Sequence, residues 1–283
     1  MPVITQLCIY PVKGMHGIAV DEAELTVRGL KFDRNWMVID ETGLFLTQRT
    51  LPKLASIRVK VNGTKLVLEE PGGSTFTLPE TTNGLRKQTV EVWGDRCEVF
   101  DCGVAISLWL TDTLGTHKGK KLRMVRFDDT FRRKVDEEYL KGEASHTAFA
   151  DGFPYLITSE SSLNRLNERL IEDGSEPVPM NRFRPNIVIK GLDAFRENRI
   201  DELASADGTY RLGLRKPCKR CKVTTVDQED GIISDPKEPL RTLTLMNTVP
   251  GLQGAYFGQN ATLLSEEGGV IRVGDEVGEQ KNG

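Results

Sequence analysis

Short apolar runs separated by turn residues make up most of the first hundred residues. Their short length and the turn residues that bound them predict strands, and 22–27 also alternates as a strand does when its successive side chains point to opposite faces of a sheet. The Asn62-Gly63 pair between two of these runs suits the tight turn of a β-hairpin. We therefore predict strands at residues 4–10, 22–27, 36–39, 57–61 and 65–68, and a strand pair within 90–99.

The hydrophobic period changes after residue 103. Val104, Leu108 and Leu114 lie at helical spacing and predict a helix, and a second helix is predicted at 163–171. Further strands are predicted at 123–127, 154–158, 187–189, 209–214, 223–226, 257–260 and 270–273. Many short strands and few helices predict an α+β fold that is predominantly β, with barrel-like architecture and added helices.

The composition narrows the function classes. The chain has 283 residues, 38% of them hydrophobic, and a net charge of -3 that argues against general nucleic-acid binding. Five cysteines are an odd number and few for a secreted scaffold, so we expect reduced thiols and a cytoplasmic protein. No apolar run is long enough for a membrane span, and the N-terminus lacks a secretory or transit pattern. An organelle-targeting segment that had been removed would leave the same pattern.

Two cysteines three positions apart carry the clearest chemical signal. Cys218 and Cys221 lie within a cationic stretch that runs from Arg215 to Lys222. A thiolate, not a thiol, is the nucleophile and the metal ligand, and neighbouring positive charge favours the thiolate. The stretch is therefore suited to hold a cysteine as a thiolate beside an anionic group.

Several interpretations of this pair remain open from the residues alone. A redox dithiol normally precedes a helix, whereas 223–226 is predicted as a strand. A zinc site needs four ligands, and no second close pair has the usual spacing. The spacing of Cys97 and Cys102 is not continued as an iron–sulfur motif requires. A single thiolate on a soft metal with an anionic cofactor suits the surrounding cations best, and an exposed basic loop with incidental thiols is the plain alternative.

Other candidate residues are weaker when taken singly. Arg184 and Asn186 precede a predicted strand and suit a phosphate or a pterin edge, or a surface ion pair. Lys13 lies on a turn, where Gly14 permits close backbone approach. Thr158-Ser159 opens a predicted helix and can cap it or donate to a phosphate.

Together these stretches resemble a known family. They occur in the order found in MOSC-domain molybdenum proteins, and more narrowly the chain resembles the amidoxime-reducing component family. The resemblance covers nearly the whole chain and implies an N-terminal MOSC β-barrel domain at 1–122 and a MOSC domain at 123–283. The motifs that carry it are Ile9-Tyr10-Pro11-Val12-Lys13-Gly14, Asp33-Arg34-Asn35-Trp36-Met37-Val38-Ile39, Arg184-Pro185-Asn186-Ile187-Val188-Ile189, Cys218-Lys219-Arg220-Cys221, Thr224-Thr225-Val226-Asp227, Glu238-Pro239-Leu240, Thr242-Leu243 and Phe257-Gly258-Gln259-Asn260.

The resemblance implies binding of the molybdenum cofactor, Mo-molybdopterin, with a protein cysteine as a metal ligand. That ligand, which is also the catalytic residue, corresponds to Cys221. Gly14 stands where many relatives have Ser, so a hydroxyl contact is lost there, and Asn260 stands where some relatives have Tyr. The implied cofactor contacts are Lys13, Arg34, Thr158, Ser159, Arg184, Asn186, Lys219, Arg220 and Asn260.

The resemblance also implies a reaction and its partners. The family reduces small N-hydroxylated compounds such as amidoximes and hydroxylamines, and some members reduce nitrite to nitric oxide. Electrons come from NADH through cytochrome b5 reductase and cytochrome b5. The alternative is a molybdenum cofactor carrier without turnover of its own, and a zinc or dithiol protein without molybdenum is a third hypothesis.

Overall fold

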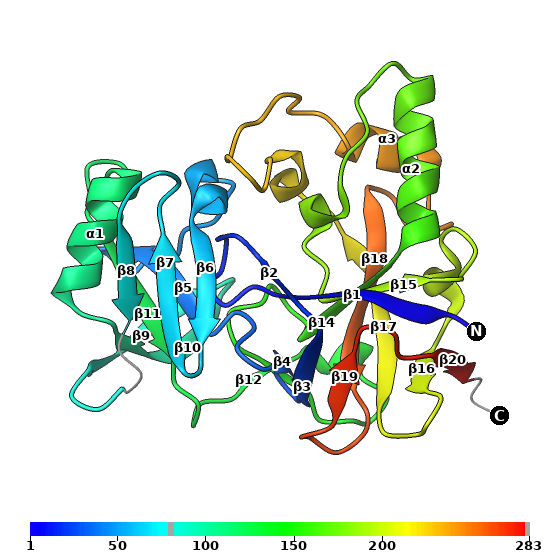
Figure 1. The fold of residues 1–283 in the computed structure, drawn as a ribbon, viewed down its shortest axis with the longest axis horizontal. Helices are drawn as coiled ribbons and strands as arrows, with labels where there is room; N and C mark the ends of the chain where they lie inside the picture. The colour runs from blue at the N-terminus through cyan, green and yellow to red at the C-terminus, as the bar shows by residue number, and fades with distance from the viewer. Residues whose placement is uncertain (79–81, 281–283) are drawn as a thin grey trace.

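The computed structural model describes residues 1–78 and 82–280, which form two lobes (Figure 1). The lobe at the left of Figure 1 holds α1 and the strands β5 to β11. The lobe at the right holds α2, α3, the N-terminus and a large sheet. Strands greatly outnumber helices in the described residues, which confirms the predicted α+β fold that is predominantly β.

The first lobe combines two antiparallel sheets with one helix. The sheet orders are β5-β11-β10-β9 and β6-β7-β8. Asn62 pairs with Lys65 across the β6–β7 turn, which confirms the predicted Asn-Gly hairpin. The elements are β5 (Trp36–Asp40), β6 (Arg58–Asn62), β7 (Lys65–Glu69), β8 (Thr75–Leu78), β9 (Arg86–Val92), β10 (Asp95–Asp101), α1 (Val104–Leu114) and β11 (Leu122–Phe127).

The second lobe is organised by an eight-stranded sheet in the order β2-β1-β15-β14-β18-β17-β16-β20. Only β14 and β15 pair in parallel within it; the other pairs are antiparallel. Helices α2 and α3 pack Leu166, Leu170 and Leu243 against Phe183 and Phe257. The elements are β1 (Val3–Ile9), β2 (Ile18–Val20), β14 (Tyr155–Ser159), α2 (Glu160–Glu172), β15 (Ile187–Lys190), β16 (Glu202–Ser205), β17 (Arg211–Lys219), α3 (Leu240–Met246), β18 (Tyr256–Leu263) and β20 (Val277–Gln280).

Shorter elements connect the lobes and border the sheets. The small sheets have the orders β19-β3-β4 and β12-β13. No helix among the described residues has the length and apolar character to cross a membrane. The remaining strands and 3-10 helices are β3 (Glu22–Thr26), β4 (Gly29–Leu30), η1 (Pro52–Ser56), β12 (Arg133–Lys134), η2 (Glu137–Tyr139), β13 (His146–Thr147), η3 (Met180–Phe183), η4 (Arg196–Arg199), η5 (Lys222–Thr225) and β19 (Val270–Arg272).

The chain starts in the second lobe and then crosses to the first. Strand β1 pairs with β15, and β3 pairs with β19 near the end of the chain. Val12, which lies between β1 and β3 in the sequence, forms a parallel bridge with Trp36 of the first lobe. Lys13 therefore lies where the chain crosses from one lobe to the other. Segments on both sides of residue 122 therefore share sheets, and the division of the chain at 122/123 stays a prediction.

The strand predicted at 223–226 is wrong, because residues 222–225 form the 3-10 helix η5. Two threonines provide the physical reason. The hydroxyl of Thr224 donates to the carbonyl of Cys221 at 3.0 Å, and that of Thr225 donates to the carbonyl of Lys222 at 2.9 Å. Such local side-chain hydrogen bonds compete with a sheet ladder, although the β-branched composition favours a strand. Cys221 thus stands at the start of a helical turn.

Gly258 lies where the sheet has no room for a side chain. Its φ of +79° is in the left-handed region, and an added Cβ would lie 2.7 Å from Cγ2 of Thr158 and 2.8 Å from the carbonyl oxygen of Ile157. We expect Gly258→Ala to lower the free energy of unfolding by about 3 kcal/mol, from backbone strain and overpacking together. Urea denaturation measures this. Gly278→Ala is the matched control, since its Cβ would meet no atom within 4 Å in β20, and an equal loss in both variants would contradict the argument.

Candidate cofactor site

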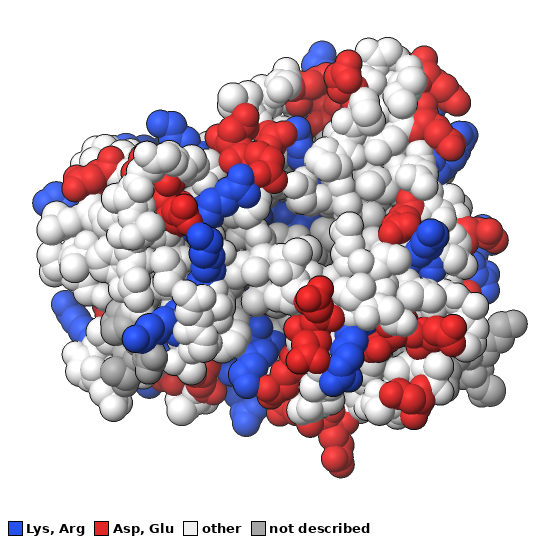
Figure 2. All heavy atoms as spheres, in the orientation of Figure 1, with Lys and Arg blue, Asp and Glu red and all other residues white. Residues whose placement is uncertain are grey.

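A cavity of about 350 Å³ lies between the two lobes. Figure 2 shows a hollow between the lobes, with Lys or Arg atoms at its base. The cavity is lined by seven cationic residues and a single carboxylate, that of Asp151, although the whole chain has a net charge of -3. The cations are Lys13, Arg34, Arg49, Arg184, Lys216, Lys219 and Arg220. The site is therefore suited to an anionic ligand.

Both cysteines of the 218–221 pair line this cavity, but they have different partners. Cys218 lies in β17 and accepts a hydrogen bond from Arg220 Nη1 at 2.8 Å. Cys221 accepts from Nε and Nη2 of Arg49 at 3.3 and 3.1 Å. All five cysteines are free, and no three His, Cys, Asp or Glu side chains of the described residues are grouped to hold a metal. The zinc hypothesis therefore has no ligand set in the described part of the chain.

Two arginines with left-handed backbone form one wall of the cavity. Arg34 and Arg184 have φ values of 50° and 54°, and their guanidinium carbons lie 4.4 and 4.2 Å from the ring centroid of Tyr10. Arg34 is paired with the buried Asp33 and donates to Oδ1 of Asn186 at 3.1 Å. Burial lowers the pKa of Arg184 to about 10. Left-handed backbone at non-glycine residues is strained and is concentrated at functional sites.

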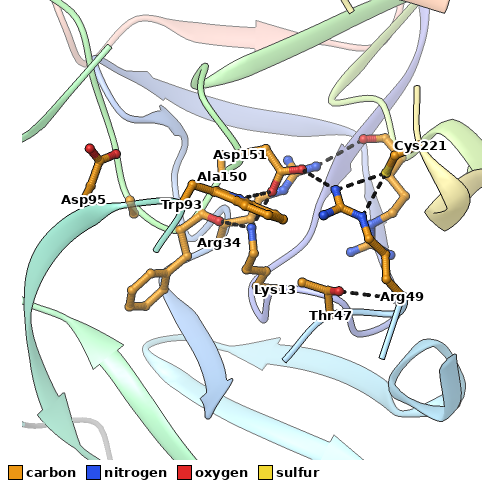
Figure 3. A network of polar contacts seen from close by, with 12 residues as sticks. Lys13, Arg34, Thr47, Arg49, Trp93, Asp95, Ala150, Asp151 and Cys221 are labelled. Atoms are coloured by element: carbon orange, nitrogen blue, oxygen red, sulfur yellow. Dashed lines mark hydrogen bonds and ion pairs between the residues drawn. The ribbon is translucent and has the colours of Figure 1, made fainter. Parts of the chain in front are cut away.

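Lys13 and Asp151 form an ion pair that also lines the cavity (Figure 3). Lys13 Nζ donates to the carbonyl of Phe149 at 2.7 Å and to Oδ1 of Asp151 at 2.5 Å, and Trp93 Nε1 donates to the same Oδ1 at 3.1 Å. Burial lowers the pKa of Lys13, and Asp151 opposes that shift. Burial works to raise the pKa of Asp151, but the charge and hydrogen bond of Lys13, the hydrogen bond from Trp93 and the charge of Arg49 together hold that pKa far below its ordinary value. Asp151 is therefore ionised at neutral pH and pairs with Lys13 as a carboxylate.

Models of two protein families match the chain. The MOSC N-terminal beta barrel domain matches residues 1–117, and the MOSC domain matches residues 144–278. Mitochondrial amidoxime-reducing component 1 of Homo sapiens is 37% identical, over 97% of this chain and 82% of that protein. The chain belongs to the amidoxime-reducing component family. Component 2 of Rattus norvegicus is 34% identical over the same shares, and molybdenum cofactor sulfurase of Bos taurus is 31% identical over 81% of this chain and 27% of its own length.

As a member of the amidoxime-reducing component family, the chain binds the molybdenum cofactor and is a molybdenum cofactor-binding reductase. The residues of the cavity suit that group. Its phosphate and dithiolene are anionic, which agrees with the excess of cations, and Cys221 offers a soft thiolate ligand. In addition, Nε of Arg220 is buried without a hydrogen-bond partner among the described residues, so Arg220 retains an N–H donor for a ligand in the cavity.

The structure brings together most of the residues that the sequence suggested. Those lining the cavity are Lys13, Arg34, Arg184, Asn186, Lys219, Arg220, Cys221 and Asn260. Thr158 and Ser159 lie outside the lining. Thr158 is buried and donates to the sulfur of Met180 at 3.3 Å, while the buried hydroxyl of Ser159 at the start of α2 has no partner in the described part of the chain. The roles of these residues stay predictions.

Three residues of this amidoxime-reducing component site were missed from the sequence. Arg49 and Asp151 line the cavity, and Trp93 contacts both of them. Arg49 meets a cysteine 172 residues further along the chain. Its neighbours Thr47 and Thr50 suggest only a polar turn, so no local pattern marks it. The one weak signal in the sequence is the polar stretch 128–150, which ends beside Asp151.

Proposed function

We propose that this protein reduces small N-hydroxylated compounds, above all amidoximes, at the cavity between its lobes. The observation that carries the proposal is the convergence of seven cations and the Cys221 thiol on one cavity of a MOSC-family chain. The names of the relatives support the substrate class. Electrons are proposed to come from NADH through cytochrome b5 reductase and cytochrome b5.

The residues of the chain have separate tasks in this proposal. Cys221 would ligate the molybdenum, and Arg34, Arg184 and Arg220 would hold the anionic parts of the cofactor through charge-assisted hydrogen bonds. When bound, the cofactor supplies the electron chemistry that converts an amidoxime, two electrons and two protons into an amidine and water. Lys13, held by Asp151, would add a further positive charge to the lining of the cavity.

The test is a metal analysis followed by turnover. The protein, expressed in cells that make the cofactor, should contain stoichiometric molybdenum, and it should oxidise NADH on addition of benzamidoxime only when cytochrome b5 and its reductase are both present. Omitting each component in turn is the control. Molybdenum without turnover would support the cofactor-carrier alternative. Zinc in place of molybdenum would refute the proposal.

The same site is proposed to reduce nitrite to nitric oxide as a side activity. Nitrite is a small anion, and the cationic lining of the cavity supports its entry. The assay above, with nitrite as substrate and nitric oxide as the detected product, measures it. A cytoplasmic location stays a prediction from the sequence.

A further inference from the structure

The first lobe contributes an arginine directly to the sulfur of Cys221. Both Nε and Nη2 of Arg49 donate to Sγ, at 3.3 and 3.1 Å, so the two groups meet in a fork (Figure 3). The side chain of Arg49 is 30% exposed and reaches this sulfur from the loop between β5 and η1. An arginine presents its donors in a fixed planar arrangement, which makes such a contact directional.

Two side chains hold the guanidinium of Arg49 in place. Its carbon lies 4.6 Å from the ring centroid of Trp93, and its Nη2 lies 3.7 Å from Oδ2 of Asp151. Trp93 stands at the β9–β10 turn with a φ of 55°, a strained conformation for a bulky residue, and it donates to Asp151. Stacking on an aromatic face and a carboxylate at the edge restrict the guanidinium from two directions.

The backbone beside Arg49 is fixed to the other lobe. The side-chain amides of Gln48 and Gln228 exchange two hydrogen bonds of 2.9 Å, and both residues are buried. Gln48 also donates to the carbonyl of Gly14 at 2.8 Å. Since Gln228 follows η5 closely, this pair joins the segment that carries Arg49 to the segment that starts at Cys221.

We propose that Arg49 is a positioning residue of the molybdenum site, one that orients the sulfur of Cys221 and raises the reduction potential of the metal bound to it. This inference rests on Cys221 as the metal ligand in the proposed function. A thiolate that accepts N–H hydrogen bonds gives less charge to its metal, and hydrogen bonding to ligand sulfur is a recognised means of tuning potential. Less donation stabilises the reduced metal, so the potential rises.

A plain charge effect must be separated from the hydrogen bonds. Lys216 is the matched control, because it also lines the cavity with one positive charge and its Nζ stacks 3.7 Å from the ring centroid of Tyr139. Lys216→Met removes the same charge as Arg49→Met and leaves the contact to Cys221 intact. Arg49→Lys keeps the charge and loses the fork.

The experiment is a potentiometric titration of the molybdenum-loaded protein, followed by the paramagnetic molybdenum signal, with the metal content measured for each variant. Arg49→Met should shift the potential downward and change the shape of the signal, by clearly more than Lys216→Met does. Arg49→Lys should give an intermediate shift. Trp93→Leu should give a smaller shift in the same direction, because it releases the guanidinium without removing it.

Equal potentials in Arg49→Met and the parent, or equal shifts in Arg49→Met and Lys216→Met, would overturn the inference. If Arg49→Met fails to fold or to retain metal, Arg49→Lys and Trp93→Leu decide the question, and parental potentials in both would be a refutation. Failure of the proposed function looks different. In that case the loaded parent does not reduce benzamidoxime, while the potentials of the variants still differ as described.

Discussion

Replacing Cys221 by serine is expected to lower the rate of amidoxime reduction by at least about 100-fold. Removing a residue that only hydrogen-bonds to a metal ligand already costs up to about that factor, and loss of the ligand itself should cost no less. A hydroxyl does not replace a soft thiolate on molybdenum, and the two hydrogen bonds from Arg49 would lose their sulfur acceptor. Because Cys221 is only partly buried at the start of η5, the fold should survive. Turnover of benzamidoxime, with thermal unfolding in parallel, measures both effects.

Cys218→Ser is the matched control for this prediction. Cys218 lines the same cavity and also contacts an arginine, Arg220, yet the family resemblance gives the ligand role to Cys221. We expect this variant to keep most of the parental activity. Equal losses in the two variants would revive the dithiol hypothesis, and full activity of Cys221→Ser would make the ligand assignment wrong.

The strands and the cysteine pair could be predicted because their signals are local. Alternation along 57–61 reports which face of a strand is buried, the unbroken apolar run at 36–39 reports a strand buried on both faces, and a turn such as Asn62-Gly63 needs only its own residues. The cationic stretch around Cys221 is likewise continuous in sequence. The same local reasoning failed at 223–226, where threonine hydroxyls closed a 3-10 turn in place of a strand.

The arrangement of the site could not be predicted because it depends on contacts between distant segments. Arg49, Trp93 and Asp151 come from three loops, and none of them stands in a motif. They lie together because Asp151 pairs with Lys13, which follows the bridge from Val12 to the first lobe, and Arg49 and Trp93 of that lobe both contact Asp151. The family resemblance supplied Arg34 and Arg184, but not the Tyr10 ring that stacks against both.

Asn186→Ala is expected to lower the free energy of unfolding by about 3 kcal/mol, even in protein without cofactor, because it leaves buried polar groups unpaired. Asn186 is 1% exposed and lies where β1, β14 and β15 meet. Its Nδ2 donates to the carbonyl of Cys8 at 3.1 Å, and its Oδ1 accepts from the backbone N–H of Leu156 and from Arg34, both at 3.1 Å. Urea denaturation of the cofactor-free protein measures the loss.

Asn260→Ala separates this structural role from cofactor contact. Asn260 lines the same cavity and pairs through its backbone with Leu156, but it is less buried than Asn186. We expect its removal to cost less than about 1 kcal/mol of stability, as is usual away from buried networks. If both variants lost the same stability, the buried hydrogen bonds of Asn186 would not be the cause of its loss. A large loss only at Asn186 would mean that its hydrogen bonds to Cys8, Leu156 and Arg34 stabilise the fold before any cofactor is bound, so that loss of activity in this variant could not be assigned to a missing cofactor contact alone.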